Sequence, residues 1–193
     1  MGEVEGQVRS EELDAERDAR RRAALAQIRQ YPDPALRMQA LEVDEADEAV
    51  PDLVGRGTRV MQGGRGGGRA VHEVGVLRRV LVYRTDDEEP VVALVNPRLT
   101  GSSEERESVD EGCLSLGAAT VVVPVERPVT VTVEATTPDG ETVTVEVEGL
   151  EARVIQHELD HLDGVLILDR TTPEERRSAL GQLRPQPILG PLV

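Results

Sequence analysis

Hydrophobic and polar residues alternate most regularly in the middle of the chain, where β-branched residues dominate. Segments 129–135 and 142–147 place an apolar residue at every second position, a pattern typical of strands with one buried face. The intervening Thr137-Pro138-Asp139-Gly140 has the composition of a tight turn, so the two segments are predicted to form a hairpin. Shorter apolar runs predict further strands at 79–83, 91–95, 120–123 and 165–168.

Helical patterns flank these strands. Residues 11–30 combine good helix formers with mixed charges, which predicts a solvated helix preceded by a disordered start. The prolines at 32 and 34 end it. Further helices are predicted at 52–62, at 150–162 before Gly164, and at 173–183, with a single helical turn at 34–38. Strands with few helices indicate one α+β domain.

Composition narrows the classes of function. The 193 residues carry a net charge of −15, which disfavours binding to nucleic-acid phosphates and to an anionic membrane surface. No apolar run approaches the ~20 residues of a membrane-spanning helix, and the acidic N-terminus lacks an apolar signal segment. A cytoplasmic protein is expected.

Some residue types are missing altogether. The chain contains no lysine, so a Schiff-base lysine and a P-loop lysine are excluded. Its single cysteine, Cys113, excludes an internal disulfide and leaves a structural thiol, a nucleophile or a metal ligand. Five glycines within residues 63–68 predict a flexible stretch.

The candidate chemistry centres on a histidine pair. His157 and His161 are spaced so that both imidazoles lie on one face of the predicted helix. Glu158 stands beside them, where a carboxylate can take a proton from water at a metal. Cys113, which follows an acidic loop, offers a thiolate as third ligand. Three protein ligands and an open fourth position are typical of a catalytic metal site, although a chance motif and a small buried cysteine are the plainer readings.

Two segments resemble the signatures of a known family. Residues 111–115, EGCLS, and 156–164, QHELDHLDG, look like the second and third signatures of the peptide deformylases, in the same order. The likeness covers about residues 28–182. It is extended by 31–37, 74–82, Arg153, Asp169 and Arg170.

This resemblance implies an α+β fold with antiparallel β-sheets around a central metal-binding helix. It implies removal of the N-formyl group from the starting methionine of new bacterial proteins, with release of formate. By the same resemblance Cys113, His157 and His161 bind one divalent metal ion. Glu158 is the general acid/base, and the Leu114 backbone N–H faces the oxyanion. Fe(II) is the expected native metal, with zinc, nickel or cobalt in purified protein.

The family's first signature is only partly kept. Residues 66–73, GGGRAVHE, align with Gly-apolar-Gly-apolar-Ala-Ala-x-Gln, so both apolar positions are lost and Glu73 replaces the glutamine. The loop after Ser115 also departs from the family's x-Pro-Gly. The residues assigned to substrate binding on this alignment are Gly66, Gly68, Arg69, Ala70, Gly112 and Leu116.

Glu73 is the most consequential departure. The family's glutamine donates to the formyl oxygen, an ionised carboxylate cannot, and losing such a donor costs on the order of 10²–10³ in rate. Either Glu73 is protonated, its pKa raised by burial and neighbouring anions, or it binds the metal or a different substrate, such as an amine. A metal's charge favours the carboxylate. Arg69 contacts substrate or, in the reading favoured here, points to solvent. His72 is interpreted as an exposed loop residue rather than an extra ligand.

The predicted organisation has three parts: an acidic extension at 1–27, helical or disordered, a deformylase-like domain at 28–182 and a proline-rich tail at 183–193. The predicted function is metal-dependent hydrolysis of a formyl-Met peptide or another N-formylated amine, by a monomer without nucleic-acid or membrane partners. The alternative is a weak or inactive paralogue that binds metal and a peptide or partner protein.

Overall fold

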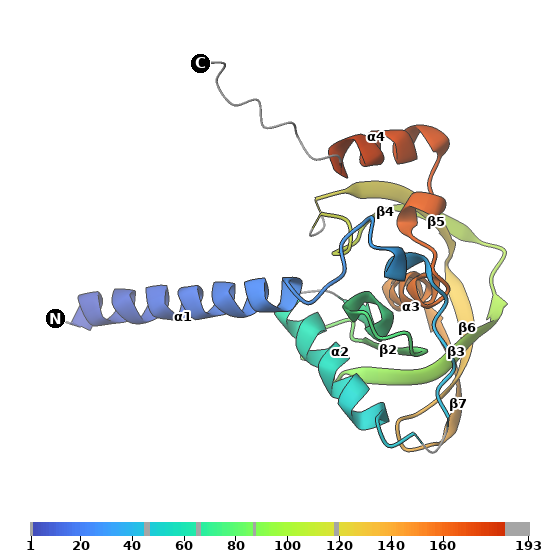
Figure 1. Ribbon diagram of the computed structural model, residues 1–193, viewed down its shortest axis with the longest axis horizontal. Coiled ribbons are helices and arrows are strands. Elements are labelled where there is room, and N and C mark those ends of the chain that lie inside the picture. The colour runs from blue at the N-terminus through green and yellow to red at the C-terminus, as the bar shows by residue number, and fades with distance from the viewer. Residues whose placement is uncertain (1, 45–46, 65–66, 87, 118–119, 184–193) are drawn as a thin grey trace.

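The computed structural model describes residues 2–44, 47–64, 67–86, 88–117 and 120–183, with side chains from residue 14 onward. Within these ranges the α-helices are α1 (Gly2–Leu25), α2 (Val50–Gly64), α3 (Gly149–Leu162) and α4 (Pro173–Leu183). The strands are β1 (Gly68–Ala70), β2 (Val80–Tyr83), β3 (Val92–Ser102), β4 (Arg106–Gly112), β5 (Val122–Pro128), β6 (Thr130–Thr136) and β7 (Thr142–Glu148). Single 3₁₀ turns are η1 (Pro34–Arg37), η2 (Val71–Val74) and η3 (Ile167–Asp169). In Figure 1, α3 lies in the middle of the body and α1 projects away from it.

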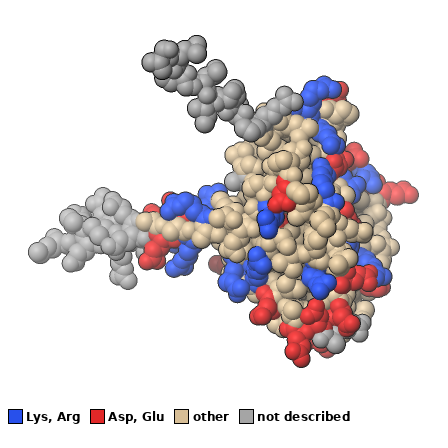
Figure 2. All heavy atoms as spheres, in the orientation of Figure 1, with Lys and Arg blue, Asp and Glu red and all other residues tan. Residues whose placement is uncertain are grey.

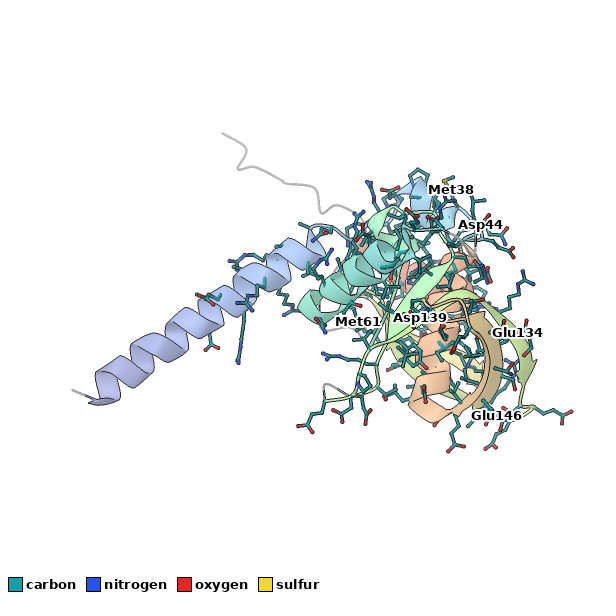
Figure 3. The ribbon with its side chains drawn as sticks, turned by 90° about the horizontal axis from the view of Figure 1, so that it is seen from below. Met38, Asp44, Met61, Glu134, Asp139 and Glu146 are labelled. Atoms are coloured by element: carbon teal, nitrogen blue, oxygen red, sulfur yellow. The ribbon has the colours of Figure 1, made fainter. Side chains whose placement is uncertain are left out.

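The strands form two antiparallel sheets. One has the order β1-β2-β3-β6-β7, and β4 pairs with β5 in the other. The predicted hairpin is confirmed, because β6 and β7 pair along their whole length and Gly140 makes the turn at φ +87°. Valines on one face of both strands enter the core, whereas Glu134 and Glu146 point away from the ribbon (Figure 3).

The main core lies between the larger sheet and α3. Because the apolar residues of α3 recur at helical spacing, one face of the helix packs on the sheet. This cluster joins Ala152, Ile155, Leu159 and Leu162 of α3 to Leu81, Leu94, Val131 and Val133. A second cluster packs β5 against η3 and α4, and a third packs α2 against η2 and β2. The predicted α+β class is confirmed, and α3, which carries both candidate histidines, is fixed between the sheets.

Three local predictions are wrong. Segment 165–168 is not a strand, because the Leu166 N–H donates to the Asp169 side chain at 2.9 Å and closes a 3₁₀ turn. The acidic segment before Cys113 is the strand β4 and not a loop. Its only buried residue is Glu111, so the sequence has no alternation of apolar residues that would indicate a strand. Part of the glycine-rich stretch is β1, which is buried and pairs with β2.

The first helix also differs from its prediction. It begins at Gly2 rather than near residue 11, and it ends at Leu25. The chain then turns into the body, where Ile28 is buried and the Arg29 N–H donates to the Glu73 carbonyl at 2.7 Å. In Figure 2, arginines stand around the junction of α1 with the body, and carboxylates crowd the lower edge of the view. None of the described helices combines the length and apolar character needed to cross a bilayer.

Candidate metal centre

Two elements bring the three candidate ligands together. Helix α3 carries His157 and His161 on one face, and Cys113 follows directly after β4. The ligand atoms of the three residues all lie within 4.8 Å of one another, and Cys113 Sγ is 3.2 Å from His161 Nε2. Cys113 and His161 are buried. This spacing matches what one tetrahedral ion requires of a thiolate and two imidazoles.

Glu111 fixes the orientation of His157. Its carboxylate lies 3.1 Å from His157 Nδ1 and accepts hydrogen bonds from Arg127 and Arg153 at 2.7–2.9 Å. Burial raises the pKa of Glu111, but the contacts with His157 and Arg127 outweigh it and lower the pKa to about 2. An anionic partner on Nδ1 leaves Nε2 as the ligand atom, the usual arrangement behind a metal-binding histidine.

The charges around the triad favour a divalent cation. Burial raises the pKa of the Cys113 thiol, but contacts with His161 and His157 outweigh it and lower the pKa to about 6. Burial lowers the pKa of His161, yet Glu73 and Cys113 raise it to about 9. The same excess of negative charge that stabilises protonated imidazoles stabilises a bound cation. The residues present therefore fit one divalent metal ion.

Glu158 is held between α3 and β1. Its Oε2 accepts a hydrogen bond from the Ala70 backbone N–H at 2.6 Å. A Cβ on Gly68 would lie 2.7 Å from the Cγ and Oε1 of Glu158, so only glycine permits this approach. Burial, reinforced by the charge of Glu73, raises the pKa of Glu158 to about 7. A carboxylate with a pKa near neutrality is suited to accept a proton and return it.

Arg69 and Glu73 form a buried ion pair next to the candidate ligands. Arg69 Nη1 donates to Glu73 Oε1 at 2.6 Å, and the two side chains are only 3% and 1% exposed. The same oxygen accepts from the Ser115 hydroxyl at 2.9 Å and lies 3.5 Å from His161 Nε2. Burial raises the pKa of Glu73, but Arg69 and the histidines outweigh it and lower the pKa to about 2. The favoured reading of Arg69 as solvent-facing is therefore wrong, and the lowered pKa of Glu73 favours its ionised form.

The remaining predicted site residues do not all lie at the cavity. A cavity of about 250 Å³ is bordered by Gly68, Arg69, Gly112 and Leu114 together with Cys113, His157 and Glu158. Ala70 instead is fully buried in the main core, and Leu116 in the cluster of β5, η3 and α4. His72 is buried rather than exposed and lies outside the ligand triad. Gly66 lies outside the described residues.

Sequence reasoning did not single out three functional contacts. These are the ion pair of Arg69 with Glu73, the support of His157 by Glu111, and the Ser115 hydroxyl on Glu73. The first had a signal, since an arginine four residues before a glutamate matches a helical ion-pair spacing. Glu111 and Ser115 stood inside the EGCLS motif without a role, because only the fold brings them to their partners.

Comparison with known proteins agrees with this geometry. A sequence model of the family described as Polypeptide deformylase matches residues 25–177. The chain belongs to the peptide deformylase family. It is 39% identical to the peptide deformylase of Desulforudis audaxviator over 154 residues, which is 80% of this chain and 98% of the relative. With the peptide deformylase of Treponema pallidum strain Nichols the identity is 41% over 148 residues, covering 77% and 89% of the two chains.

Solved peptide deformylases share the fold. The Thermotoga maritima structure is 38% identical with a TM-score of 0.70, and the match covers 76% of this chain and 97% of that one. The Synechococcus elongatus structure, a complex with actinonin, is 32% identical with a TM-score of 0.75, and the match covers 80% and 85%. This chain thus has the peptide deformylase fold around its three candidate metal ligands.

Proposed function

We propose that this chain is a metal-dependent hydrolase that removes the N-formyl group from a formyl-Met peptide or a related N-formylated amine. The observation that carries the proposal is the position of Glu158, because it borders the same cavity as Cys113 and His157, whose ligand atoms cluster with that of His161. A purely structural metal site has no use for a base beside its open position.

In the proposed reaction the metal, Glu158 and the Leu114 backbone N–H each have one role. A divalent metal held by the triad supplies Lewis-acid chemistry, which lowers the pKa of water and polarises a carbonyl oxygen. Glu158 accepts a proton from the attacking water as the oxygen–carbon bond forms. It then delivers that proton to the amine nitrogen as the carbon–nitrogen bond breaks, leaving formate and a free amine. The Leu114 backbone N–H, on the cavity's rim, stabilises the oxyanion.

Fe(II) is the proposed native ion, with zinc, nickel or cobalt as substitutes. One thiolate and two imidazoles suit each of these borderline metals. A protein purified without oxygen is expected to contain one iron per chain and to lose activity in air, whereas a nickel-loaded sample keeps its activity.

The direct test is formate release from a formyl-Met tripeptide by the nickel-loaded protein, with Glu158→Ala at equal nickel content as the blank. The acetyl-Met tripeptide serves as the matched substrate control. We expect kcat/KM near 10⁴ M⁻¹s⁻¹ or more, an ordinary enzyme value, and no release of the free amine from the acetyl peptide. Activity equal to the blank, with nickel bound, would favour the binding paralogue instead.

A further inference from the structure

We propose that the Arg69 guanidinium, anchored by Glu73, is the hydrogen-bond donor that faces the formyl oxygen of the substrate. The inference rests on the proposed function and names the group that replaces the family's glutamine amide. Glu73 then holds Arg69 in place and does not contact the substrate.

Arg69 occupies the required position. Its side chain is buried and borders the same cavity as Cys113, His157 and Glu158. Nη2 lies 3.9 Å from the Cβ position of Gly64, and that position lies 2.9 Å from the Leu114 side chain. The guanidinium and the Leu114 side chain therefore both approach Gly64, and the Leu114 backbone N–H is the other proposed oxyanion donor.

The hydrogen bonds of Arg69 are incomplete. Nη1 is used by Glu73, but the buried Nε has no partner among the described residues. A buried donor without a partner is costly, and such groups in native proteins call for a ligand, an ion or water. Because the guanidinium has more N–H groups than Glu73 uses and Arg69 borders the cavity, it can donate to a substrate oxygen there.

Glu73 acts as an acceptor in this arrangement. Its Oε1 accepts from Arg69 and Ser115 and lies 3.5 Å from His161 Nε2, whereas its buried Oε2 has no partner among the described residues. Together, the Arg69 guanidinium and the Glu73 carboxylate carry no net charge. The apolar residue and glutamine of the family signature carry none either. The pair differs in retaining charged N–H donors, which hydrogen-bond an oxyanion more strongly than a neutral amide does.

The sharpest test compares two double variants that remove both buried charges. Arg69→Met/Glu73→Gln restores a side-chain amide donor, whereas Arg69→Met/Glu73→Met leaves none. At equal nickel content we expect the Met/Met variant to lose about 10²-fold or more in kcat/KM, the usual effect of removing one oxyanion donor. The Met/Gln variant should stay within about tenfold of wild type by the same reasoning. A Met/Met variant with wild-type kcat/KM would overturn the proposal.

Formate affinity gives a readout independent of turnover. Calorimetric titration of nickel-loaded protein with sodium formate should show a Kd about tenfold higher or more in the Met/Met variant, because a charged donor to the carboxylate is lost. The matched control is Arg79→Met, since Arg79 is also ion-paired, to Asp163 at 2.6 Å, but lies outside the cavity. We expect Arg79→Met to leave formate affinity unchanged.

The two failures are distinguishable. If the wild type releases formate no faster than Glu158→Ala, the proposed function fails, and the formate titration still decides the role of Arg69. If the wild type is active but the Met/Met variant keeps both its rate and its formate affinity, Arg69 is only a structural partner of Glu73. An equal loss of formate affinity in Arg79→Met would also overturn the assignment.

Discussion

The cavity has two walls that keep the family's sequence pattern to different degrees. On one side, α3 and the end of β4 present the ligand triad, with Glu111 behind His157. On the other side, β1 presents Arg69, whose buried partner Glu73 lies on η2; the family signature described above has an apolar residue and a glutamine at these two positions. The fold holds both walls against the same small cavity.

The difference shows which requirements a site places on its residues. A metal fixes ligand atom, distance and orientation together, so a thiolate and two imidazoles have few substitutes. The opposite wall has only to place a donor and balance charge. A coupled change of two residues can meet that requirement where either change alone would leave an unpaired buried charge.

Glu158 joins the two walls, so its removal should have the largest effect. Glu158→Gln keeps the shape of the side chain but replaces the carboxylate, the proposed base, by an amide. The kcat/KM for the formyl-Met tripeptide should therefore fall about 10²–10⁴-fold. Bound nickel per chain, measured by mass spectrometry, should not change. A variant retaining more than a tenth of the wild-type rate would break the assignment of Glu158.

Displacing Glu158 from its position against β1 should have the next largest effect. A Cβ at position 68 would lie 2.7 Å from Glu158, so Gly68→Ala must displace the base. A misplacement of about 1 Å costs about 10²-fold in rate. The matched control is Gly181→Ala on α4, where a Cβ meets nothing within 4 Å. Equal kinetics for the two variants would contradict the close approach of β1 to Glu158.

Weakening the support of the candidate ligand His157 should have a moderate effect. Glu111→Gln removes the negative charge behind His157 and should cost about 10–100-fold in metal affinity or activity. Metal competition with a chromophoric chelator measures the affinity directly. Glu107→Gln on the same strand, whose side chain is exposed, is the control. An unchanged affinity in Glu111→Gln would show that the neighbouring arginines orient His157 without this carboxylate.

A region outside both walls should affect stability only. Burial raises the pKa of Asp169, but hydrogen bonds from Arg37 and the Leu166 N–H, with Arg176 nearby, outweigh it and lower the pKa. Its contribution is therefore complete above the unfolded value of about 3.9 and is lost as the pH falls through the folded-state pKa. Asp169→Asn should remove about 1 kcal/mol and lower Tm at pH 7 by about 2–4 °C.

Thermal unfolding measured from pH 7 to pH 3 checks this sign. The difference in Tm between wild type and Asp169→Asn should shrink below about pH 4, because the wild-type carboxylate is then being protonated. A difference that widens as the pH falls would contradict the lowered pKa of Asp169. Activity at pH 7 and 25 °C should be the same in both proteins.

The sequence predicted those parts of the molecule in which chemistry or periodicity is local. The β6–β7 hairpin, α4 and α3 follow from alternation, caps and helical spacing, and the ligand triad followed from two motifs. Strand β4 escaped prediction because its structure comes from pairing with β5 rather than from apolar alternation. The environment of Glu73 escaped as well, because its charge state depends on which way Arg69 points, and only the packed cavity decides that.

The proposed hydrolase is tested by measuring formate release while metal-free protein is titrated with nickel and the bound metal is counted in each sample. The rate from a formyl-Met tripeptide should rise in proportion to bound nickel and level off at one ion per chain. The Glu158→Gln protein should bind the same nickel and stay at background. A wild-type protein that binds one nickel while its rate stays at the Glu158→Gln level would contradict the claim that the two walls together form a working hydrolase.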